Sequence, residues 1–246
     1  MRLAMVMMVV ALLGCSVLAQ EESAASGSQT IPASQASPSP TPKPSDHTKV
    51  NWLYGAFVPK DVPLEPLSGH ERIQVWVRAT FTTYGIYAKT ALFSLNDQAN
   101  NHPSAWGDGW AGYGKRVASR QGQFVVQNSL SALGNGILGY EPRYDVCRCE
   151  GFWRRTGHAV GRNFVTYNRT ENKLRPQLAL YAGAFGAGVV AGSWTPNHDL
   201  LHLGAHGALS QAIFGVGANL VAEYWHDVRR ALHLGKKPAK DGTQKP

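Results

Sequence analysis

Charged side chains are scarce in this sequence of 246 residues. Asp, Glu, Lys and Arg make up 16% of it, against about 25% in an average soluble protein. The 24 Lys and Arg outnumber the 16 Asp and Glu and give a formal net charge of +8, which favours anionic surfaces as partners. Because the basic residues form no long stripe, nucleic acid is not an expected partner. Small residues are abundant instead, with 26 glycines where average usage predicts about 17.

Recognised catalytic and cofactor motifs are missing. The segment GDGWAGYGKR (107–116) has the glycine and lysine spacing of a phosphate-binding loop, but that loop needs Ser or Thr after the lysine and a buried strand before it. Here Arg116 follows Lys115, and the polar stretch NNHPSAW precedes Gly107, so no nucleotide is expected. No His-Glu-x-x-His or Gly-x-Ser-x-Gly motif occurs either. These absences favour a non-enzymatic protein without a cofactor.

The N-terminus lacks an apolar run long enough to span a bilayer, which takes about 20 residues. The run from Leu3 to Leu13 follows a single arginine and precedes small residues, a pattern typical of a signal peptide over residues 1–19. Cleavage after Ala19 competes with a lipobox-like Leu-Leu-Gly-Cys that would end in a lipidated Cys15. Both alternatives predict export to the periplasm or to the outer-membrane-associated cell envelope.

Composition divides the rest of the chain into three parts. Residues 20–50 are rich in Pro, Ser and Thr and predict a disordered linker. Residues 235–246 are rich in lysine and predict a basic disordered tail. The intervening residues 51–234 are numerous enough to form a single domain with its own core.

Helical spacing of apolar and small residues dominates this domain. A capping box formed by Ser68 and Glu71 opens a predicted helix over 69–96. A loop rich in Asn, Asp, Gly and Pro follows. Further helices are predicted over the ranges 115–138, 151–165, 178–194 and 197–233. The expected fold is therefore all-α, a glycine- and alanine-rich bundle of about five helices.

Small residues recur at four-residue spacing within 178–194, at Ala179, Gly183, Ala187 and Ala191. Such a stripe lets helix backbones approach closely. That approach would offset the roughly 1 kcal/mol that each glycine costs inside a helix. The last predicted helix also carries small residues, so we expect the stripes to face each other or a second copy in a homo-oligomer. At 17 residues, 178–194 also lies at the lower edge of a membrane span.

Histidines and cysteines define two alternative chemistries. His198 and His202 are one helical turn apart and could hold a metal ion, as in a metal-dependent hydrolase. A third histidine, His206, lies about 12 Å from His198 along the helix axis and is too far to bind the same ion. Cys147 and Cys149 could form a short-range disulfide or serve a thiol redox protein.

Four basic side chains are candidates for binding anionic groups: Lys115, Arg116, Arg154 and Arg155. The last two lie beside Trp153, and tryptophan is favoured at membrane interfaces. Together with the low charge content, they favour a membrane-associated structural or binding component of the envelope. The alternative for the arginines is a solvated helix face.

Several segments resemble a family of exported bacterial envelope proteins to which no activity is assigned. The resemblance covers most of 51–234 and is carried by the segments PLSGHER (66–72), WGDGWAGYGKR (106–116), EPRY (141–144), GFWRRTGHA (151–159) and SWTP (193–196). It implies an envelope location and a helical domain. Asp145 and the Cys-Arg-Cys triplet depart from the family pattern, and no site residue follows from the resemblance.

Overall fold

The computed structural model describes residues 48–60, 62–196 and 199–232. The predicted signal peptide 1–19, the lipidation candidate Cys15 and the basic tail 235–246 lie outside the described residues. The all-α prediction is confirmed, since helices dominate the described chain and the strands are few and short. The helices are α2 (Gly69–Phe81), α3 (Tyr84–Ala99), η1 (Ser104–Trp106), α4 (Trp110–Ile137), α5 (Phe152–Phe164), α6 (Leu178–Ala191) and α7 (Leu200–Ala231).

The single helix predicted over 69–96 is in fact two helices. The capping box is present: the Ser68 hydroxyl accepts a hydrogen bond from the backbone N–H of Glu71, and the Glu71 carboxylate accepts one from the backbone N–H of Ser68. Helix α2 then ends at Phe81, where the backbone N–H and hydroxyl of Thr82 both donate to the carbonyl of Arg78. A side chain that bonds backward in this way competes with helix continuation, so α3 begins afresh.

The loop predicted between the helices 69–96 and 115–138 is shorter than expected. Helix α3 continues to Ala99, and α4 begins at Trp110 rather than at Lys115. Gly112 therefore lies inside α4, where an added Cβ would approach the carbonyl oxygen of Gly107 to 2.3 Å. The glycine is required here because the connection folds back onto the first turn of its own helix.

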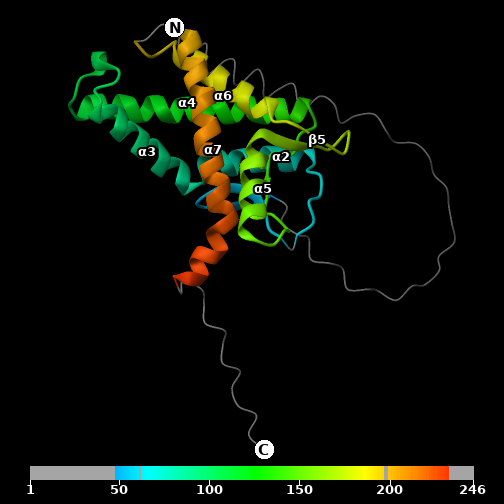
Figure 1. Ribbon diagram of the computed structural model, residues 1–246. Helices are drawn as coiled ribbons and strands as arrows, with labels where there is room; N and C mark the ends of the chain where they lie inside the picture. The colour runs from blue at the N-terminus through cyan, green and yellow to red at the C-terminus, as the bar shows by residue number, and fades with distance from the viewer. Residues whose placement is uncertain (1–47, 61, 197–198, 233–246) are drawn as a thin grey trace, which may run out of the picture.

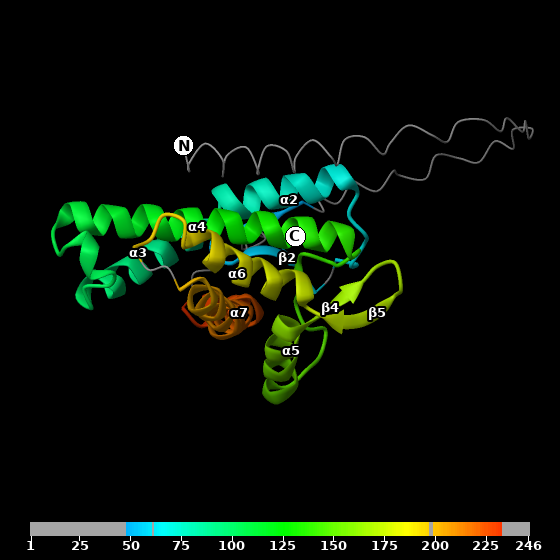
Figure 2. The same ribbon diagram turned by 90° about the horizontal axis from the view of Figure 1, so that it is seen from above.

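Close contact between small residues holds α4, α6 and α7 together, as expected from the stripe. Ala187 and Ala191 are buried, and a Cβ at Gly183 would collide with Ser131 of α4. On the other side of α6, a Cβ at Gly188 would collide with the backbone of α7. Figures 1 and 2 show α6 lying along α4, with α7 crossing both. The glycines thus serve backbone-to-backbone packing.

Short strands connect the helices. Strands β1 (Val50–Asn51), β2 (Gly55–Val58) and β3 (Tyr144–Asp145) form one small sheet, in which β1 is antiparallel and β3 parallel to β2. Strands β4 (Val165–Asn168) and β5 (Lys173–Pro176) form an antiparallel hairpin beyond α5. Two-residue strands are too short to be recognised by alternation in the sequence.

The domain begins earlier than composition suggested. Thr48 is buried and accepts hydrogen bonds from Arg78 through its carbonyl and its hydroxyl. Val50, placed at the end of the linker, pairs with Ala56 in the small sheet. The boundary at residue 51 is therefore too late, and residues 48–50 belong to the folded domain.

None of the helices in the described part of the chain is long and apolar enough to cross a membrane. Helix α6, the core of the predicted 178–194 segment, has 14 residues and packs on both sides against other helices.

Candidate functional site

The interior of the described domain is unusually polar. Its largest fully buried side chains include Arg116, Glu141 and Glu223, whereas many large apolar side chains lie on the surface. Buried charged groups are stable only when they are paired and hydrogen-bonded. Each of these three residues accordingly forms the centre of a hydrogen-bonded network.

The EPRY segment supplies two of the networks. Glu141 receives hydrogen bonds from Arg143, at 2.7 Å to Nε, and from Arg169. Arg143 also donates to the backbone carbonyl of Glu65, and Arg169 donates to that of Leu64. Tyr144, the last residue of the segment, donates its hydroxyl proton to Glu223 of α7. The segment thus ties the N-terminal part of the domain to the hairpin and to the last helix.

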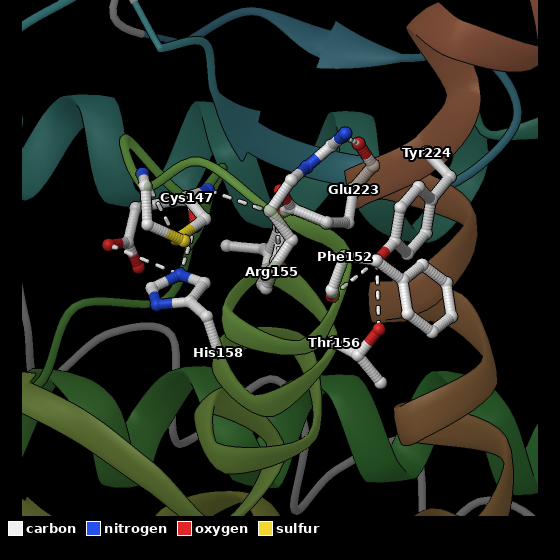
Figure 3. The surroundings of a disulfide bond; sticks show 10 residues. Cys147, Phe152, Arg155, Thr156, His158, Glu223 and Tyr224 are labelled. Atoms are coloured by element: carbon white, nitrogen blue, oxygen red, sulfur yellow. Dashed lines mark hydrogen bonds and ion pairs between the residues drawn. A yellow bond between two sulfur atoms is a disulfide. The ribbon is translucent and has the colours of Figure 1, made fainter.

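Glu223 is the centre of a cluster between α5 and α7 (Figure 3). Its carboxylate accepts hydrogen bonds from Arg155 Nε at 3.0 Å, from the Tyr144 hydroxyl at 2.7 Å and from the backbone N–H of Cys147 at 2.9 Å. Burial and the hydrogen bond to Glu223 raise the pKa of Tyr144, so the phenol remains a donor at physiological pH. Arg155 also donates to Asp227, and this hydrogen bond lowers the pKa of Asp227.

Cys147 and Cys149 form a disulfide beside this cluster. Cys147 is buried and its backbone N–H is held by Glu223. His158 of α5 approaches the carbonyl of Asp145 to 2.8 Å, and Arg162 forms an ion pair with the Asp145 carboxylate. The disulfide therefore lies in a segment fastened to both α5 and α7, which is the disulfide alternative of the sequence analysis.

Arg116 does not present its charge to the surface. Its side chain is 1% exposed and donates to the carbonyls of His102, Pro103 and Gly107, and to the side chains of Gln98 and Asn101. These bonds fold the 101–107 connection over the start of α4. The prediction of Arg116 as an anion-binding residue is wrong, because every donor faces an acceptor of its own chain.

The other three predicted basic residues are not gathered into one site. Arg155 is committed to Glu223 and Asp227. Lys115 and Arg154 are exposed, but one lies near the start of α4 and the other near the start of α5. Those two helix ends lie apart in both views of the molecule (Figures 1 and 2).

A cleft of about 430 Å³ lies between α3, α4 and the first half of α7. His202, one of the two predicted metal ligands, lines it together with His206 and His102. His198, the other predicted ligand, lies outside the described residues. Within the described ranges no group of three or more His, Cys, Asp or Glu residues could hold a metal ion. The cleft also contains Arg120, which forms a bidentate ion pair with Asp97 at 2.7 and 2.9 Å.

Comparison of the chain with protein-family models, with curated proteins and with solved structures gave no match.

Proposed function

We propose that the protein is an exported, non-enzymatic component of the cell envelope that binds an anionic membrane surface peripherally. The supporting observation is that large apolar side chains lie on its surface while charged side chains lie in its interior. Trp110 is 88% exposed and Trp153 is 82% exposed, while the interior is filled by small residues and paired charges. Exposed apolar side chains that gather in a patch mark an interaction surface, and Trp153 and the exposed Phe152 lie in edge contact with each other.

A lipid surface fits this pattern for two reasons. Tryptophan is favoured at the boundary between headgroups and acyl chains, and each of the two tryptophans has an exposed basic residue nearby in sequence, Lys115 or Arg154. The net charge of +8 adds a long-range attraction to anionic headgroups. The role of these basic residues is thus to approach the headgroups, while Arg116 and Arg155 stabilise the fold.

Replacing both tryptophans by serine is expected to weaken binding to vesicles by at least about tenfold. Partial withdrawal of each ring from water contributes about 1 kcal/mol or more. Both rings are largely exposed, and each makes an edge contact with a neighbouring aromatic ring, that of Tyr113 or Phe152, so the fold is expected to survive. Flotation of the purified full chain with vesicles of phosphatidylglycerol and phosphatidylcholine measures the effect, and circular dichroism checks the fold.

Two arms of the same experiment separate charge from apolar insertion. The double variant Lys115→Gln and Arg154→Gln is expected to lower flotation at low salt and to make the remaining binding less sensitive to salt than that of the wild type. Vesicles of phosphatidylcholine alone are expected to bind less protein. Membrane association is rejected if the wild-type chain stays in the aqueous fraction with anionic vesicles at low salt.

A further inference from the structure

Lys89 of α3 is a cation without a carboxylate partner in the described part of the chain. Its Nζ lies 5.7 Å from the ring centroid of Phe93, 5.9 Å from that of Phe124 and 5.6 Å from that of Phe214. Among the described residues it forms no hydrogen bond and no ion pair. Aromatic faces compensate only part of the hydration that a buried ammonium loses. Burial, and to a lesser extent Arg120, accordingly lowers the pKa of Lys89.

This lysine lines a narrow recess of about 70 Å³ that shares residues with the larger cleft. Other recess residues that carry hydrogen-bond donors are Thr90 of α3, Arg120, Gln123 and Gln127 of α4, and His206, Ser210 and Gln211 of α7. No Asp or Glu of the described chain lines the recess. The recess therefore offers donors and a positive charge, and no carboxylate.

The charged groups around the recess leave its positive charge uncompensated. Asp97, the carboxylate of the adjoining cleft, is engaged by two hydrogen bonds from Arg120. His206 faces the same space from α7. Burial, Arg120 and the neighbouring His202 lower the pKa of His206, so its ring is neutral at neutral pH. The balance at the recess is one unpaired positive charge.

The larger cleft adds apolar surface beside its polar groups. Its walls include the apolar side chains of Trp106, Leu203, Leu209, Ile213 and Phe214. The volume of about 430 Å³ lies within the range of small-molecule sites, which is about 300–1,000 Å³. A ligand that fills both parts has a polar head at the recess and an apolar body in the cleft.

We propose that this cleft binds a monoanionic organic acid with an apolar body, whose carboxylate pairs with Lys89 in the recess. A single unpaired ammonium matches a single negative charge. Gln123 and Ser210 can donate to the second carboxylate oxygen. The aliphatic or aromatic body of the acid covers the apolar walls of the cleft. This binding does not depend on the membrane association proposed above, since α3, α4 and α7 form the cleft within one chain.

Isothermal titration of the purified full chain with sodium decanoate, without vesicles and below its micelle concentration, tests the proposal. Wild-type protein is expected to bind one decanoate per chain, and decanol more weakly. Lys89→Met is expected to raise the Kd for decanoate about tenfold to a hundredfold, because a charge-assisted hydrogen bond contributes that much affinity. The matched control Lys173→Met removes an exposed lysine of β5 and is expected to keep the wild-type Kd.

The Lys89→Met variant is expected to remain folded. A lowered pKa means that the folded chain holds the lysine proton less tightly than the unfolded chain does. At neutral pH Lys89 is protonated in the folded and in the unfolded chain, so its buried charge lowers the free energy of unfolding. Its removal is expected to leave Tm unchanged or to raise it. Absence of decanoate binding by the wild-type chain, equal binding of decanol, or an unchanged Kd in folded Lys89→Met would each overturn the proposal.

Discussion

Replacing Gly188 by alanine is expected to lower the free energy of unfolding by about 2 kcal/mol. The new Cβ would lie 2.2 Å from the carbonyl oxygen of Leu203 and 2.8 Å from the Cα of Gly204. Both atoms belong to the backbone of α7 and cannot rotate away, so α6 and α7 must separate. Overpacking of this kind costs about 1–3 kcal/mol and outweighs the gain in helix propensity. Urea denaturation followed by circular dichroism measures the change.

Two other helical glycines provide controls of opposite sign. A Cβ at Gly114 in α4 or at Gly217 in α7 would meet nothing within 4 Å. Replacing either glycine by alanine is expected to raise the free energy of unfolding by up to about 1 kcal/mol, because alanine is the better helix former. If Gly188→Ala behaves like these controls, close approach of α6 and α7 does not hold the domain together.

The contrast between these glycines shows how far the sequence could predict the packing. Small residues at four-residue spacing identify one face of 178–194, and that face is buried. The sequence does not tell which helix lies opposite each position. Gly183 faces Ser131 of α4, whereas Gly188, little more than one turn later, faces α7. Such pairings arise from helix crossing angles, which depend on the whole domain.

Elements fixed by local capping were predicted better than those that depend on distant partners. The start of α2 follows from the Ser68 and Glu71 pair, which is local in sequence. The pairing of Phe57 with Tyr144 in the small sheet joins residues far apart in the chain, and no local pattern announces it. The break after Phe81 was also missed, since apolar residues continue on both sides of it.

The candidate sites also differ in whether local sequence is enough to predict them. The disulfide between Cys147 and Cys149 could be anticipated, because only spacing and cysteine chemistry are needed. The burial of Arg116 could not, since its acceptors are mostly backbone carbonyls of a folded-back loop. Lys89 was not singled out, although one signal was present. It shares a helix face with Phe93, four residues later, and so follows the apolar side of α3.

Replacing Glu223 by alanine is expected to have the largest effect on stability, a loss of about 3–5 kcal/mol in the free energy of unfolding. The variant leaves the Tyr144 hydroxyl and the backbone N–H of Cys147 without their acceptor and removes the buried one of the two carboxylate partners of Arg155. Loss of the buried partner of an ion pair, together with the acceptor of two further donors, costs about this amount. Glu223→Gln keeps an acceptor oxygen and is expected to lose less. Denaturation of the oxidised protein measures both variants.

Asp227 is the matched control, since it accepts from the same arginine one turn later in α7. Its side chain is 48% exposed, against 0% for Glu223. An exposed ion pair contributes at most about 1 kcal/mol, so Asp227→Asn is expected to change stability by less than that. If Glu223→Ala and Asp227→Asn cost the same, the interior charges do not hold α5 against α7. Contact between α5 and α7 would then have to come from packing, whereas the Gly188 variant tests the separate contact between α6 and α7.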